Sequence, residues 1–88
     1  MLTIGRTAKK KDVLTMIVRG RKEQVEMVQN VFSQTPGSVI QSKNIFRDSF
    51  ELVYALKLPQ AEEEKLLLIF NSMEGVEVNV LAPQTQVA

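Results

Sequence analysis

Residues 50–58 place the strongest constraint on the fold, because a large apolar side chain occupies every second position. The large residues are Phe50, Leu52, Tyr54, Leu56 and Leu58, and they alternate with Glu51, Val53, Ala55 and Lys57. A period of two places the large side chains on one face of an extended strand. Pro59 ends the run. The sequence therefore predicts a strand that packs one face against a core and leaves the other face open.

Three more strands are predicted from similar signals. Residues 12–19 are rich in β-branched side chains and end at Gly20, which favours a central strand with apolar residues on both faces. Residues 39–46 follow a Pro-Gly turn and form the second strand. Residues 76–80 alternate valine with polar side chains and form the last strand.

Two segments switch to the 3.6-residue period of a helix. In residues 21–34 the apolar stripe is Val25, Val28, Val31 and Phe32. The second helix opens at Ala61 and carries a stripe of Leu66, Phe70 and Met73. Glu62, Glu63 and Glu64 suit the positive end of its dipole, and Gly75 suits its C-terminal cap.

The resulting order is βαββαβ, which predicts one α+β domain with a ferredoxin-like sandwich. We expect a four-stranded antiparallel sheet of order 4-1-3-2, with two helices on one face because both crossovers are right-handed. The domain is predicted to span residues 12–82. Residues 1–11 are interpreted as a flexible basic lead-in and residues 83–88 as a polar tail.

The composition removes most catalytic chemistry. The 88 residues include no cysteine and no histidine, so thiolate nucleophiles, the usual proton shuttle and cysteine-rich metal sites are missing. The three consecutive glutamates fan about 100° apart on a helix and cannot converge on one ion. We therefore expect a protein that is not an enzyme and that needs no cofactor or metal.

Two basic features suggest partners for the chain. Residues 1–22 contain seven basic residues and one acidic residue, and Lys9, Lys10 and Lys11 are consecutive. Such a segment suits nucleic acid, an anionic surface or solvent alone. Base stacking on the sheet is disfavoured because the strand aromatics, Phe50 and Tyr54, are predicted to face the core. Nucleic acid is therefore not the expected partner, and its binding through the basic segment stays an alternative.

The turn after the first strand is a second candidate site. It consists of Arg19, Gly20, Arg21 and Lys22. Backbone amides ahead of a helix can hold an anion, and the arginines would add charge. A plain strand-to-helix turn explains the single glycine equally well. If the chain is a small-ligand sensor, this turn is the predicted site.

The uncovered face of the sheet is the third candidate. If Leu14, Met16 and Val18 face the helices, the opposite face collects Val13, Thr15 and Ile17 from the first strand and Val53 and Ala55 from the third. Adjacent apolar residues on neighbouring strands form a patch, and such patches mark association surfaces. The sequence thus predicts self-association, or a protein partner, through this face.

The order of elements, together with the sequence Met73-Glu74-Gly75-Val76-Glu77-Val78, resembles ACT-type regulatory domains. It also resembles the ACT-like cytosolic C-terminal domains of MgtC-like and related uncharacterised bacterial membrane proteins. The resemblance implies a regulatory domain in the cytoplasm, on the inner face of a membrane, beside a transmembrane domain. Where amino-acid-binding ACT domains have a Pro-Gly pair, this chain has Arg19-Gly20-Arg21-Lys22.

Overall fold

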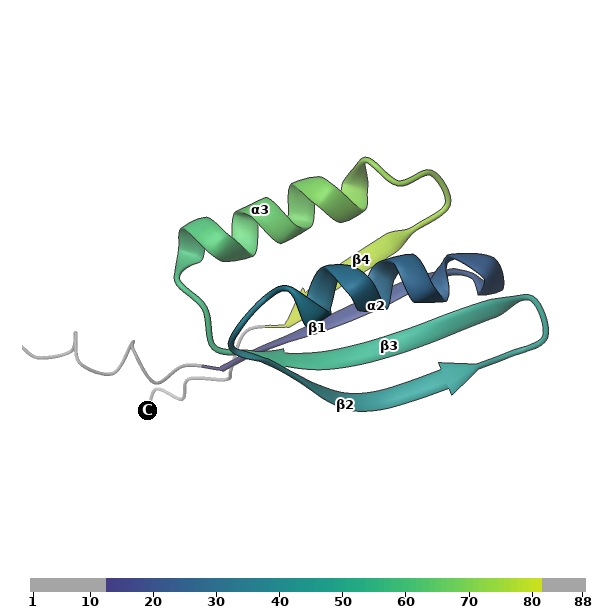
Figure 1. Ribbon diagram of the computed structural model, residues 1–88, viewed down its shortest axis with the longest axis horizontal. Helices are drawn as coiled ribbons and strands as arrows, with labels where there is room; N and C mark the ends of the chain where they lie inside the picture. The colour runs from purple at the N-terminus through teal and green to yellow at the C-terminus, as the bar shows by residue number, and fades with distance from the viewer. Residues whose placement is uncertain (1–12, 82–88) are drawn as a thin grey trace, which may run out of the picture.

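The computed structural model describes residues 13–81, which form four strands and two helices in the predicted order. The elements in chain order are β1 (Leu14–Arg21), a short 3-10 turn η1 (Lys22–Gln24), α2 (Val25–Ser33), β2 (Ser38–Ile45), β3 (Ser49–Leu56), α3 (Gln60–Asn71) and β4 (Glu77–Leu81) (Figure 1). All neighbouring strands are antiparallel, in the order β2-β3-β1-β4. The α+β ferredoxin-like fold and its strand order are therefore confirmed.

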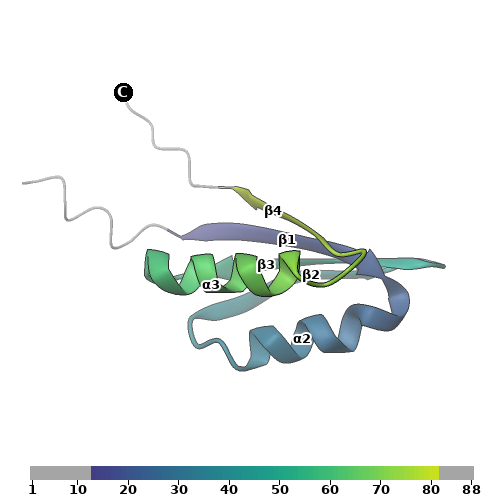
Figure 2. The same ribbon diagram turned by 90° about the horizontal axis from the view of Figure 1, so that it is seen from above.

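The two helices lie side by side along the same face of the sheet (Figures 1 and 2). Between them and the strands lies one core of buried side chains: Met16, Val18, Val28, Phe32, Phe50, Leu52, Tyr54, Leu56, Leu66 and Phe70. Six of the ten come from β1 and β3, at alternating positions. The strong period of two in β3 thus produces the sheet side of the core, and β1 and β3 are the central strands.

Three aromatic rings connect the helices to the sheet. The ring of Phe32 in α2 stacks on Tyr54 in β3, with centroids 3.7 Å apart and planes tilted by 11°. The ring centroid of Phe70 in α3 lies 5.2 Å from that of Phe32, so Phe32 also contacts the second helix. Aromatic pairs of this kind add roughly 0.5–1.5 kcal/mol beyond the area that they bury. One side chain of α2 therefore holds both the sheet and the second helix.

The first helix begins later than its apolar period predicts. Gly20 and Arg21 continue β1, and the chain then makes the 3-10 turn before α2 starts. The amide of Gln24 anchors this turn: its Oε1 accepts from the Arg21 backbone N–H at 2.9 Å, and its Nε2 donates to the carbonyl of Glu74, also at 2.9 Å. The contact with Glu74 is 50 residues distant in sequence, so local periodicity could not reveal it.

The third strand ends two residues before the prediction. Beyond Leu56, the N–H of Lys57 still donates to the carbonyl of Gly37 at 2.9 Å, but Gly37 lies in the α2–β2 turn, before β2 begins. Gly37 has a positive φ of 94° there, which glycine adopts without the strain that a side chain would bring. Leu58 still packs partly buried against the core. The predicted inward set of β3 is thus kept, although the strand itself is shorter.

The core contacts of α3 lead to a stability prediction. Phe70→Ala should lower the free energy of unfolding by about 3–5 kcal/mol, because the fully buried ring leaves a cavity against Phe32. Urea unfolding followed by far-UV circular dichroism measures the change. Leu68→Ala on the same helix is the control: its side chain is 71% exposed, so a change within about 0.5 kcal/mol is expected. Equal losses in the two variants would contradict the described core.

Candidate association surface

The face of the sheet opposite the helices is covered by no element of the described residues, and we call it the open face. Strand pairing arranges its side chains in rows across the sheet. The first row is Leu81, Thr15, Ala55 and Val39; the second is Asn79, Ile17, Val53 and Ser42; the third is Glu77, Arg19, Glu51 and Asn44. Each row crosses β4, β1, β3 and β2 in that order. The register therefore decides which side chains are neighbours on this surface.

The open face is apolar at one end and charged at the other. The first two rows contain no charged side chain, and Val13 extends them beyond Thr15. Val13 is 40% exposed, Val39 60% and Leu81 54%. The central side chains of these rows, such as Ile17 and Val53, are half-buried by their neighbours. The five residues predicted for an interaction face are thus brought together, and two further apolar side chains, Val39 and Leu81, extend the surface to both sheet edges.

An ion pair lies at the charged end of the open face. The guanidinium of Arg19 meets Glu51 Oε2 through Nε at 3.0 Å and through Nη2 at 2.9 Å. Arg19 and Glu51 are cross-strand partners in β1 and β3, so the register holds the pair directly above the sheet. Glu77 lies beside Arg19 on β4. The pair contributes little to stability at an exposed site, but it places alternating charges at a defined level of the face.

A shallow hollow of about 390 Å³ lies at the apolar end of the sheet. Its open-face wall includes Val13, Val39, Ala55 and Lys57, from the three strands β1, β2 and β3 or their immediate ends. Gly37 and Gln41 contribute to its rim. The hollow therefore gives the apolar end a concave shape, which a convex apolar side chain of another molecule could fill.

The sheet edges are protected in a way that the open face is not. β2 carries a bulge between Ile40 and Ser42, which disturbs its outer row of hydrogen-bonding groups. Lys43 follows the bulge and donates to Gln29 Oε1 at 3.3 Å. β4, at the other edge, has only five residues. Bulges, lysines and short strands are the features that discourage pairing at a sheet edge.

The predicted ligand turn does not gather its residues around one point. The N–H of Arg21 already donates to Gln24, and the N–H of Lys22 donates to the carbonyl of Asp48 at 3.1 Å. The two arginines face carboxylates of the same chain, because Arg19 pairs with Glu51 and Arg21 lies 3.8 Å from Glu23. The two amides and the Arg19 guanidinium are therefore engaged within the chain, and anion binding at this turn stays a prediction.

Close packing accounts for the glycine of this turn. Gly20 is buried in β1, where an added Cβ would lie 2.9 Å from Gln24 Oε1 and 3.0 Å from the ring of Phe50. Both distances are shorter than ordinary carbon contacts. A residue without a side chain is thus required by its neighbours in the fold, independently of any ligand.

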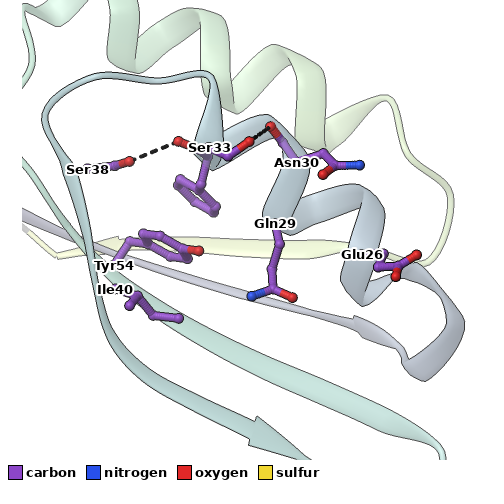
Figure 3. A pocket seen from close by; sticks show the side chains of 8 residues that line it. Glu26, Gln29, Asn30, Ser33, Ser38, Ile40 and Tyr54 are labelled. Carbon is purple, nitrogen blue, oxygen red and sulfur yellow. Dashed lines mark hydrogen bonds between the residues drawn. The ribbon is translucent and has the colours of Figure 1, made fainter.

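A second concavity lies on the helix side, between α2 and β2, and has a volume of about 430 Å³ (Figure 3). Glu26, Gln29, Asn30 and Ser33 line it from α2, while Ser38, Ile40 and Tyr54 line it from the strands, as Figure 3 shows. Burial raises the pKa of the Tyr54 hydroxyl above its ordinary value, and a hydrogen bond with Gln29 lowers that pKa by less. The hydroxyl is therefore protonated at neutral pH, a hydrogen-bonding group rather than a base.

The raised pKa of Tyr54 can be measured without interference, since the chain has one tyrosine and no tryptophan. Ultraviolet titration should place the ionisation midpoint above 10.0, and Gln29→Ala should raise it further. The unfolded chain ionises first as pH increases, so this group's contribution to stability is complete below pH 10 and declines above it. A midpoint at 10.0 in the folded protein would contradict the described burial.

Several sequence-based expectations meet the limits of the described residues. Lys9, Lys10 and Lys11 lie outside residues 13–81, as do the predicted lead-in and tail. Within residues 13–81, no group of three or more carboxylates could hold a metal ion. No helix of the described chain is both long and apolar enough to cross a bilayer. The open face is thus the candidate that the structure assembles most completely from the predicted residues.

Comparison with known proteins adds no assignment. No protein-family model matches the chain, and no curated protein is significantly similar to it.

Proposed function

We propose that this chain is a non-enzymatic association domain, which binds a second copy of itself through the open face of its sheet. The observation that carries the proposal is the pair of uncharged rows toward the apolar end of that face. Val13, Val39 and Leu81 remain exposed there, around the half-buried centre of Ile17 and Val53. Contiguous apolar surface on a folded domain is typical of an interaction site.

Small size gives association a physical benefit. A domain of 88 residues buries only about two thirds of the surface of its unfolded chain, so its stability margin is modest. Covering the open face would remove further apolar area from water and would favour the folded, associated form by mass action. Protected edges and an unprotected face together favour stacking of sheets over addition of strands.

A regulatory role fits this proposal better than a sensor role does. Self-association can connect the state of one polypeptide to that of a neighbour without any chemistry at the domain itself. In the ligand turn, the backbone N–H groups of Arg21 and Lys22 already donate within the chain. Within the described residues, the three rows of the open face contain no aromatic side chain for a nucleic-acid base.

The test of the proposal is the mass of the purified protein as a function of concentration. Light scattering or sedimentation equilibrium should show a monomer at low concentration and a larger species at high concentration. Ile17→Lys with Val53→Lys should keep the chain monomeric, because it buries two charges at the centre of the contact. A wild-type chain that stays monomeric up to millimolar concentration would contradict the proposal.

A matched control uses the helix side of the molecule. Leu68→Lys introduces the same charge at an apolar residue that is 71% exposed on α3, far from the open face. This variant should associate as the wild type does. Unfolding midpoints of all variants establish that the lysines act on association rather than on folding.

A further inference from the structure

We infer that the two copies pack open face to open face about a two-fold axis that runs along the strands, between β1 and β3. In this arrangement Arg19 of each copy contacts Glu51 of the other. The inference rests on the proposed self-association and adds to it the orientation of the copies and the residues that specify that orientation.

The strand register makes the open face match itself in this orientation. Rotation about an axis along the strands exchanges β1 with β3 and β4 with β2, and it keeps every row at its own level. Thr15 then meets Ala55 of the second copy, and Ile17 meets Val53. At the flanks Leu81 meets Val39, and Asn79 meets Ser42. In these two rows apolar side chains thus face apolar ones and an amide faces a hydroxyl, whereas Val13, beyond the first row, meets Lys57.

The charges match in the same orientation. Arg19 and Glu51 are cross-strand partners on either side of the axis, so rotation places the Arg19 of one copy over the Glu51 of the other. The two ion pairs form a cluster of four alternating charges. The guanidinium has five N–H donors, which allows one arginine to serve both carboxylates. No charge in this cluster faces an apolar side chain.

The other simple face-to-face orientation places unlike groups together. In that orientation the two-fold axis crosses the strands at the level of Met16 and Tyr54. It would lay the apolar end of one copy on the charged end of the other. Leu81 would then lie on Asn79 and Val39 on Ser42, while Arg19 would cover Val13 and Glu51 would meet Lys57. Burial of a charge against apolar surface is costly, but each orientation sets one charged side chain of a copy against Val13. The match of apolar side chains in the rows therefore favours the axis along the strands.

Shape supports the same orientation. Leu81 is 54% exposed at the β4 edge, and the rotation brings it over Val39 of the second copy. Val39 forms part of the hollow that also includes Val13 and Ala55. Leu81 of one copy therefore projects toward the hollow of the other. Because the axis is two-fold, this contact occurs twice in the dimer.

The size of the face predicts the strength of association. Four strands about 4.8 Å apart and eight residues of about 3.4 Å give a face near 500 Å² per copy. Two such faces bury about 1,000 Å² in total, which is the lower limit for a specific interface. We expect a dissociation constant on the order of 10⁻⁵ M or weaker. Protein at roughly 0.1–1 mM is therefore suitable for the experiments.

The charge contact is tested by mixing two variants. Arg19→Glu makes both face charges acidic, and Glu51→Arg makes both basic, so each variant alone should associate at least about tenfold more weakly than wild type. An equimolar mixture should form a heterodimer, because every contact between the copies becomes attractive again. Monomers in the mixture at concentrations where the wild type is dimeric would overturn the inference.

A control pair separates this effect from attraction between opposite net charges. Lys22→Glu and Glu26→Lys change the net charge by the same amounts, at exposed positions in η1 and α2. Each control variant alone should associate as the wild type does. Equal weakening of association in the control variants would assign the charge effect to net charge and would overturn the specific contact.

A cross-linking experiment tests the axis by distance and leaves Arg19 and Glu51 unchanged. The chain has no cysteine, so Lys57→Cys introduces a single thiol at the end of β3. With spacings of about 4.8 Å between strands and 10 Å between sheets, the two positions lie about 11 Å apart for the inferred axis and about 23 Å apart for the axis across the strands. A bismaleimide that spans about 10 Å should therefore link the inferred dimer. Leu68→Cys on α3 should not be linked.

The outcomes separate the two proposals. A monomeric wild type contradicts self-association itself. A second outcome is a dimer that Ile17→Lys with Val53→Lys abolishes, while the mixed charge variants form no heterodimer and Lys57→Cys gives no cross-link. This outcome retains the open face as the interface and overturns only the inferred axis.

Discussion

The fold depends on the packing between the helix-facing side of β1 and β3 and the aromatic rings of the two helices. Phe32 stacks on Tyr54 and contacts Phe70, so it joins the sheet to both helices. Because side chains alternate along a strand, burial of one set of β1 and β3 residues fixes which residues lie on the opposite face. The composition of the open face is therefore a direct consequence of the core.

The two surfaces of the sheet differ in how they are protected from other molecules. Pairing at the edges meets a bulge and Lys43 on β2, and a strand of only five residues at β4. The open face has uncharged rows over about half its length and an ion pair at one end. A surface that is apolar, concave at one end and charged at a defined level has the properties of a specific contact, because it combines a driving force with a feature that selects orientation.

Sequence patterns predicted the fold and the centre of the candidate surface, and they failed where distant residues decide the structure. Gln24 bonds to Glu74 and anchors the 3-10 turn ahead of the first helix, and β3 ends where it meets Gly37 of the α2–β2 turn in place of a partner strand. At Gly20 the sequence pattern does not reveal the ring of Phe50, which lies against the glycine and leaves no space for a side chain. Each case is a tertiary contact that leaves no local period.

Val39 and Leu81 illustrate the same limit on the candidate surface. Each lies in an edge strand. Alternation along the strand predicts which side chains share a face of the sheet, but it does not reveal their neighbours on the next strand. The bulge after Ile40 shifts the register of β2, so the row that contains Val39 could not be counted from the sequence. Alternation therefore found the apolar centre, while register was needed to find its edges.

By itself the sequence determined the secondary structure, the strand order and the side of each central strand that faces the core, because periods of two and 3.6 residues are local properties of the chain. Only the tertiary structure decided which residues of separate strands stand side by side. That decision places Arg19 on Glu51 and aligns Thr15 with Ala55, Val39 and Leu81. The physical reason is that register is fixed by hydrogen bonds and packing between strands, and these contacts join residues that are far apart in the chain.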